Sequence, residues 1–265
     1  MKKVLAITMA ALLIVMLLAG CGTNEPSNQA DNNANTEDAA TNTPEADNVE
    51  SEPEETPEQE QEDVTYEVTY KNVMVYTSSI GSTWAQAIVE VTNTGTKDLY
   101  LSSASFDLED ASGALVSVLK MVSVCPDVIS PGEKAYYYDA STLENVESEV
   151  ELTIVPHLNV KEAKVDRIRF PVSEDSLSMD QFDDITLIGR VENNTEETQS
   201  MVYVAVILYN SNDAPIGHLT TILMEDLAPG DKIGFECSAW SLPDSVTLDS
   251  IAWYEVIAYP TQFQF

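Results

Sequence analysis

The chain has 265 residues, of which 44% are hydrophobic, and its 45 acidic residues against 12 basic ones give a formal net charge of −33. So acidic a chain is repelled by nucleic acid and by anionic lipid headgroups, and we expect no nucleic-acid partner. The hydrophobic content is sufficient for buried cores, and the length permits two domains of ordinary size.

The N-terminus has the pattern of an export signal. Lys2 and Lys3 precede an apolar run over residues 4–18, which is short for a bilayer span but has the length of a signal-peptide hydrophobic region. The run ends in Leu-Ala-Gly-Cys at 18–21, which resembles the lipobox of bacterial lipoproteins. This resemblance implies a signal peptide over 1–20 and a diacylglyceryl group on Cys21. An ordinary secretory signal or an uncleaved anchor is the alternative.

Residues 21–63 follow as the lipidated cysteine and a linker. Between 22 and 63 there are 14 acidic residues and no lysine or arginine, and Val49 is the only aliphatic side chain larger than alanine. Such a segment cannot bury enough apolar surface to offset its ordering entropy, so we expect it to be disordered. It resembles the tether of Gram-positive lipoproteins, which lifts a folded part off the membrane.

The folded part shows an internal duplication. From Val64 onward, short runs of β-branched and aromatic residues alternate with polar ones and are broken by Asn-Thr-Gly and Pro-Gly turns. Three blocks recur in order, 89–95 with 189–195, 106–110 with 206–210 at an offset of 100, and 130–134 with 228–232 at an offset of 98. A repeat of this length is domain-sized, so we predict two β-domains, at 64–157 and 158–265.

Each repeated block has an expected local role. Asn93 and Asn193 follow a strand, where an asparagine side chain can bond the backbone of its own turn. The Pro-Gly pairs are expected to form turns in which glycine accepts a positive φ. Cys125 and Cys237 belong to different repeats and form no Cys-x-x-Cys pair, so we expect two free, buried thiols rather than a disulfide.

One block carries a family resemblance. Phe106-x-Leu108-x-Asp110 in the first repeat and Val206-x-Leu208-Tyr209-Asn210 in the second are similar to the signature of the FxLYD family of bacterial extracytoplasmic domains. The second repeat is the better match, and the first fits a sister family of the same fold. The resemblance covers about 64–260 and implies an immunoglobulin-like β-sandwich for each repeat. It implies no activity, because such sandwiches support many functions.

The two repeats differ on one face of the strand that carries this block. Positions 103, 105, 107 and 109 are Ser, Ser, Asp and Glu, whereas the aligned residues are Tyr203, Ala205, Ile207 and Tyr209. The second repeat is therefore apolar on both faces of this strand, which is typical of a strand covered on both sides. Either the first repeat or the aromatic C-terminal segment 259–265 covers it, or it binds a partner. In the second case Tyr203, Ile207 and Tyr209 are the contact candidates.

Charged residues form three further clusters. Lys161, Lys164, Arg167 and Arg169 lie between the repeats, and we interpret them as neutralised by nearby carboxylates, with contact to a polyanion as the alternative. The densest acidic groups, at 107–110 and 180–184, lack EF-hand spacing and are interpreted as solvated loops. His157 and His218 each stand alone in the sequence. No catalytic, metal or cofactor motif is present.

The sequence therefore predicts an all-β fold of two tandem immunoglobulin-like β-sandwiches after a signal peptide and a disordered linker. We expect a lipid-anchored protein on the extracytoplasmic face of a Gram-positive-type cell membrane. Its predicted function is a non-enzymatic binding or adaptor module without a metal or cofactor, acting on an envelope protein or wall component. A structural spacer without a specific ligand, and a metal or solute receptor that uses the acidic loops, are the alternatives.

Overall fold

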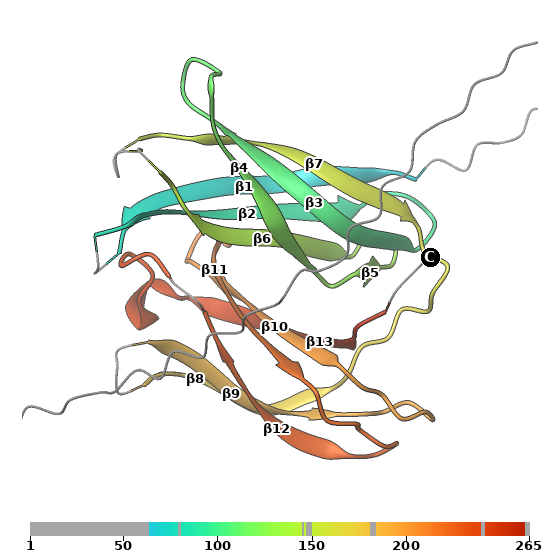
Figure 1. The fold of residues 1–265 in the computed structure, drawn as a ribbon. Coiled ribbons are helices and arrows are strands. Elements are labelled where there is room, and N and C mark those ends of the chain that lie inside the picture. The colour runs from blue at the N-terminus through green and yellow to red at the C-terminus, as the bar shows by residue number, and fades with distance from the viewer. Residues whose placement is uncertain are drawn as a thin grey trace, which may run out of the picture. The chain divides into compact units, whose positions relative to one another are not determined.

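The computed structural model describes residues 64–262, apart from 79–80, 145, 147–149, 181–183 and 240–241 (Figure 1). The expected signal peptide, Cys21 and the linker lie outside the described residues, as does the end of the C-terminal segment at 263–265. The described chain consists of strands, loops and a single 3₁₀ turn, η1 (Leu248–Ser250). No helix in this part is long and apolar enough to cross a membrane. The predicted all-β fold is confirmed.

The first sandwich contains seven antiparallel strands. They are β1 (Tyr66–Thr77), β2 (Thr83–Asn93), β3 (Leu99–Glu109), β4 (Leu115–Cys125), β5 (Val128–Ile129), β6 (Lys134–Thr142) and β7 (Thr153–Glu162). One layer has the order β1-β2-β6, and in the other β3 lies between β7 and its partners β4 and β5. β4 joins the layers, because Leu119 lies opposite Phe106 of β3 whereas Cys125 lies opposite Tyr136 of β6.

The second sandwich repeats this arrangement. Its strands are β8 (Val172–Met179), β9 (Ile185–Glu192), β10 (Val202–Tyr209), β11 (Pro215–Leu223), β12 (Lys232–Ser238) and β13 (Trp253–Pro260). The order is β13-β10-β11-β12-β9-β8, and the single pair Thr220–Ser238 joins the β13-β10-β11 half to the β12-β9-β8 half. β11 therefore passes between two layers as β4 does, and the duplication seen in the sequence is a duplication of the fold.

Each sandwich has its own hydrophobic core. The first encloses Val89, Phe106 and Tyr137, and the second encloses Val206 and Phe235, together with neighbouring aliphatic residues from both layers. These side chains alternate along their strands with residues that point away from the core, as the period of two requires. Burying each large apolar side chain contributes about 1.5–3 kcal/mol. Both cysteines are free and buried, as predicted.

Buried asparagines fix the same turn in both repeats. The Asn93 side chain donates to the carbonyls of Lys97 (2.8 Å) and Ile129 (3.1 Å) and accepts from the amide of Gly95 (3.0 Å). Asn193 makes the equivalent bonds to Glu197 (2.8 Å), Leu227 (2.8 Å) and Thr195 (2.9 Å). A buried side chain thus satisfies three backbone groups that the turn would otherwise leave unpaired.

The hairpin and Pro-Gly turns also match between the repeats. Asp110 accepts from the amides of Ser112 and Ala114 at the β3–β4 turn, and Asn210 does the same at the β10–β11 turn. Gly132 and Gly230 both have a φ of +83°. That angle lies in the region that glycine enters without steric cost, so the predicted turn chemistry is confirmed.

The boundary between the sandwiches differs from the sequence prediction. β7 pairs with β3 from Thr153 to Glu162, so the first sandwich extends five residues beyond the predicted end at His157. The link to the second sandwich then spans residues 163–171. The prediction placed the boundary too early, because this last strand returns to pair with β3 and the pairing is set by tertiary contacts.

Candidate functional site: the interface between the two sandwiches

The apolar outer face of β10 packs against the first sandwich. Ile207 and Tyr209 are 1% and 3% exposed and Tyr203 is partly buried, and they cluster with Cys125 and Tyr136. Figure 1 shows β6 of the first sandwich facing β10 and β11 of the second. The first repeat therefore covers Ile207 and Tyr209, whereas Tyr203, the third tentative partner contact, keeps an accessible part that lines a cleft.

The C-terminal segment extends the face that the first sandwich covers, because Tyr259 is directly opposite Tyr203 in the β10–β13 pair. Tyr259 of β13 is buried beside Tyr203, with ring centroids 5.5 Å apart, and its hydroxyl donates to the carbonyl of Val124 at 3.1 Å. Gln262 follows with a long contact from its amide to Asp127 of the first sandwich, at 3.4 Å. As far as it is described, the C-terminal segment therefore lies beside β10 in the same sheet and widens this face, so the prediction that the segment covers the face is wrong for residues 259–262.

Polar contacts cross the interface beside the apolar ones. The hydroxyl of Tyr209 donates to the hydroxyl of Tyr136, and the two rings meet edge to face with centroids 6.4 Å apart. The side-chain amide of Gln86, which is fully buried on β2, donates to the carbonyl of Ile216 at 3.1 Å. Directional hydrogen bonds across an interface specify one orientation more strictly than apolar packing does.

Glu255 of β13 lies at the exposed end of the tyrosine pair. The hydroxyls of Tyr136 and Tyr209 each lie 3.4 Å from its Oε2. Burial and the nearby Glu255 carboxylate both raise the pKa of these tyrosines, so each keeps its proton and remains a donor. Trp253 stacks on Tyr209 at a centroid distance of 3.8 Å and closes that edge.

A buried thiol of the first sandwich and a buried imidazole of the second meet at the interface. Cys125 Sγ lies 3.5 Å from His218 Nε2, and the other ring nitrogen of His218, Nδ1, is buried without a hydrogen-bond partner. Burial raises the pKa of Cys125 and lowers the pKa of His218 to about 3. Both groups are therefore neutral at pH 7, whereas an activated cysteine nucleophile requires a thiolate. The sequence interpretation of His218 as isolated missed this contact.

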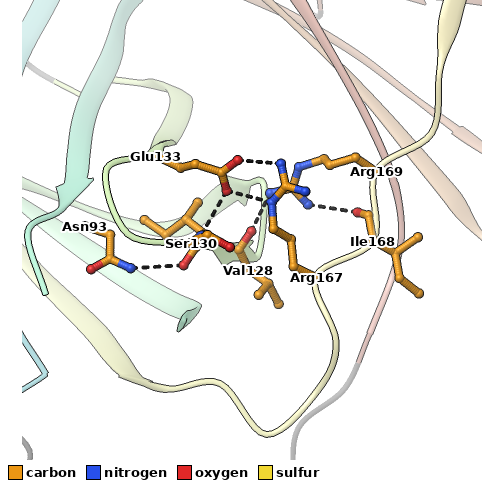
Figure 2. Close-up of polar contacts among 8 residues, drawn as sticks. Asn93, Val128, Ser130, Glu133, Arg167, Ile168 and Arg169 are labelled. Carbon is orange, nitrogen blue, oxygen red and sulfur yellow. Dashed lines mark hydrogen bonds and ion pairs between the residues drawn. The ribbon is translucent and has the colours of Figure 1, made fainter. Parts of the chain in front are cut away.

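A first cleft of about 370 Å³ opens where the link 163–171 crosses the interface. Arg167 donates through two nitrogens to the carboxylate of Glu133, and Arg169 donates to the carbonyls of Val128 and Ile168 (Figure 2). Although burial acts to raise the pKa of Glu133, the bonds from Arg167 and the Ser130 amide hold it below its ordinary value. Neutralisation by a carboxylate is thus confirmed for Arg167.

The acidic groups of the hairpin loops have structural partners. Asp107 pairs with exposed His157 at 3.0 Å, Asp110 caps its hairpin, and Asp180 accepts from the amide of Asp184 at 3.0 Å. Across the described residues, no group of three or more His, Cys, Asp or Glu side chains is arranged to hold a metal ion. The described acidic residues Asp107, Asp110 and Asp180 thus each have a partner within their own sandwich.

No protein-family model matches the chain, and no curated protein matches it. The resemblances to the lipobox and to the FxLYD signature therefore stay predictions that rest on the residues quoted above.

Proposed function

We propose that this chain is a membrane-anchored extracytoplasmic lipoprotein whose folded part is a non-enzymatic binding module of the cell envelope. The basic start, the apolar run and the cysteine at 21 support the anchor, since two or more acyl chains hold a protein stably at a membrane. The acidic linker supports display of the folded part away from the membrane surface.

One observation carries the binding function. The interface between the sandwiches is bordered by clefts whose walls come from both repeats, such as the cleft lined by Glu133 of the first sandwich and Glu255 on β13. Clefts at the junction of two domains are where ligand sites most often form. A chain that served only as a spacer has no need for polar side chains that converge on such clefts.

The second candidate is a rigid spacer. The burial of Ile207 and Tyr209 favours it, because the most apolar strand face of the second repeat is used to join the sandwiches. A joint of this kind would hold two sandwiches in one orientation and extend the reach of the anchor.

The anchor is tested with the full chain in a bacterial host. Cys21→Ser should release the protein from the membrane fraction and remove the mass of the diacylglyceryl group. Cys237→Ala is the matched control, because it removes a buried thiol and should leave both properties unchanged. Membrane partition of Cys21→Ser with an unchanged lipid mass would rule out lipidation at this residue.

The binding function is tested by cross-linking in living cells. A photoreactive residue at Met121, which is 85% exposed beside the interface, should capture one recurrent envelope component. The same residue at Ile188, 49% exposed on β9, is the control and should not capture that component. If both positions instead captured many different proteins in proportion to their abundance, the binding module would be refuted and the spacer favoured.

A further inference from the structure

The cleft of about 370 Å³ where the link crosses the interface has walls from both sandwiches. Lys134 and Tyr136 of β6 line one side of it, and Glu255 and Ile257 of β13 line the other. Tyr136 and Ile257 both belong to the interface cluster, and residues two apart on a strand point to the same side. Lys134 and Glu255 therefore point toward the interface as well, and the cleft gathers charged groups of both sandwiches around one space.

Arg169 places a positive charge without an ionic partner at one end of this cleft. Its guanidinium donates to the carbonyls of Ile168 and Val128, which are neutral (Figure 2). In the described part of the chain, the carboxylate of Glu133 pairs with Arg167, and no carboxylate forms an ion pair with Arg169. Burial, and next the charge of Arg167, lower the pKa of Arg169. A guanidinium has more donors than these two bonds use, so Arg169 can also bind an anion.

Glu255 places a negative charge without an ionic partner at the other end. It is exposed, and its contacts are the hydroxyls of Tyr136 and Tyr209, each 3.4 Å from Oε2. Lys134, the lysine of the cleft, pairs instead with Glu90 at 3.0 Å. The ion pairs among the described residues thus leave one cation and one carboxylate of the same cleft unmatched.

Strand register gives the separation of these two charges. The amide of Phe170 donates to the carbonyl of Ala258 at 2.9 Å, which places the link beside the end of β13. The guanidinium of Arg169 lies 5.7 Å from the ring centroid of Tyr259. Glu255 comes three positions before Ala258 and four before Tyr259, about 10–13 Å along a strand. An extended peptide of three residues spans about 10–11 Å, so its two ends can reach both charges, whereas a single amino acid cannot.

The edge of β13 offers backbone groups to such a peptide. β13 is the last strand of its sheet, and among the described strands it pairs with β10 alone. Successive residues of an antiparallel strand alternate between bonding the partner strand and pointing away from it. The carbonyl of Ala258 points away from β10, since it bonds Phe170, and Val256 has the same orientation two residues earlier. Val256 lines the cleft, so its amide and carbonyl are placed to pair with an added strand.

From these groups we propose that the cleft binds a short peptide whose amino and carboxyl ends are both free. The carboxylate lies at Arg169, the ammonium lies at Glu255, and the backbone between them bonds Val256. Tyr136 and Ile257 supply apolar contacts to its side chains. A simple anion would be repelled by Glu255 and a simple cation by Arg169, so a dipolar ligand fits this cleft better than either.

This inference rests on the proposed binding function and names the ligand class. It is tested by calorimetric titration of the purified full chain, in detergent, with trialanine. Trialanine should bind saturably, and free alanine about tenfold more weakly or worse, because it cannot reach both charges. Capture of one envelope component in cells without trialanine binding would refute the peptide ligand alone. Trialanine binding without such capture would support this site and refute the envelope partner.

Trialanine amide separates recognition of the carboxylate from general attraction to an acidic protein. The amide carries a net positive charge, so general attraction would strengthen its binding. Loss of the contact with Arg169 should instead weaken its binding about tenfold or more. In Arg169→Gln, trialanine and its amide should bind with similar affinity. If that variant fails to fold, the comparison of the two peptides on the unaltered chain still decides the outcome.

Nα-acetyl-trialanine tests the contact of the ammonium with Glu255. Acetylation should weaken binding to the unaltered chain about tenfold or more, and much less in Glu255→Gln, where no carboxylate remains to lose. Glu236→Gln is the matched control, because it removes the same charge from an exposed position on β12 that does not line this cleft. The full effect of acetylation should remain in that control.

A trialanine isomer with D-alanine at its carboxyl end distinguishes two sources of the peptide. Wall peptides contain D-residues and protein fragments do not, so tighter binding of the isomer indicates a wall peptide and tighter binding of all-L trialanine indicates a protein fragment. Equal affinity for trialanine and its amide would overturn the proposal. So would equal affinity for alanine, an unchanged effect of acetylation in a folded Glu255→Gln variant, or no saturable binding of either isomer.

Discussion

Acidification should destabilise this protein through His218. Its ring lies between Cys125 of β4, Tyr138 of β6 and Tyr203 of β10, with Asp139 lining an adjoining cleft, and burial lowers its pKa to about 3. The unfolded chain binds a proton at the ordinary pKa of 6.5, whereas the folded chain does not. Because the unfolded state then holds more protons, stability is intact above pH 6.5 and is lost as the pH falls toward 3.

The size of the effect follows from the difference in pKa. Each pH unit below 6.5 removes about 1.4 kcal/mol from the free energy of unfolding, so about 2.7 kcal/mol is lost by about pH 4.5. The group is fully buried, so solvent screening does not reduce this value substantially. For a domain of ordinary stability, 5–15 kcal/mol, a loss of about 2.7 kcal/mol is readily measured.

The assay is urea unfolding at about pH 7, 5.5 and 4.5 for the full chain and for His218→Gln. Other groups titrate as well, since burial raises the pKa of Asp139 and hydrogen bonds from the Ser112 side chain and nearby amides lower that of Asp110. These contributions are common to both proteins and cancel in the difference. Between about pH 7 and pH 4.5, the free energy of unfolding of the unaltered chain should fall by about 2.7 kcal/mol more than that of His218→Gln. If the free energies of unfolding of the two proteins changed equally with pH, the assignment of His218 as buried and neutral would be refuted.

Three further predictions concern the fold. Asn93→Ala and Asn193→Ala should each lower the free energy of unfolding by about 2–4 kcal/mol, since three backbone groups lose their partner. Thermal unfolding measures this loss. If either variant were destabilised no more than a typical surface substitution, the turn geometry would be contradicted. Gly132→Ala should lower the free energy of unfolding by about 1–2 kcal/mol through the backbone strain at its φ of +83° alone, because no atom lies within 4 Å of the added Cβ. Gly95→Ala is unsuitable as a control, since its Cβ would also meet the Thr65 side chain. A double-mutant cycle on Arg167 and Glu133 should give a coupling of about 0.5–1 kcal/mol that declines with added salt, because both side chains are one-third exposed; a coupling insensitive to salt would show that the pair is buried.

Local chemistry explains which parts of the fold could be predicted from the sequence. The Asn93 and Asn193 turns and the Pro-Gly turns depend on residues close together in the chain, and their geometry agrees with the prediction. The end of the first sandwich was predicted too early because β7 (Thr153–Glu162) is a partly exposed outer strand, and its place is set by pairing with β3 more than 40 positions earlier in the chain. Few local signals report such a pairing.

The candidate site shows the same limit. The apolar outer face of β10 is visible in the sequence, but the sequence left open whether a partner or the first repeat covers it. A matching signal exists in the first repeat, where Tyr136 and Tyr138 flank the inward-facing Tyr137 and make both faces of β6 aromatic. Pairing these two faces would have predicted the interface. The contact between Cys125 and His218 spans 93 positions and has no such signal.

A final prediction tests the interface on which both proposals depend. Ile207 and Ile222 lie on the outer face of the β10–β11 pair, because Tyr203 on that face is directly opposite Ile222. Ile207 is 1% exposed against the first sandwich, whereas Ile222 is 46% exposed. Ile207→Ala should therefore lower the free energy of unfolding by about 2–4 kcal/mol, since it leaves a cavity in a packed interface. Ile222→Ala is the matched control and should cost about 0.5 kcal/mol.

Denaturant unfolding of the two variants distinguishes a closed face from an open one. If β10 were free to meet a partner in solution, both isoleucines would be solvated before unfolding and the two substitutions would cost nearly the same. A large cost for Ile207→Ala alone requires that the first sandwich cover this face in the free protein. The tyrosines beside it would then be structural, and any ligand would have to bind at the clefts around the interface.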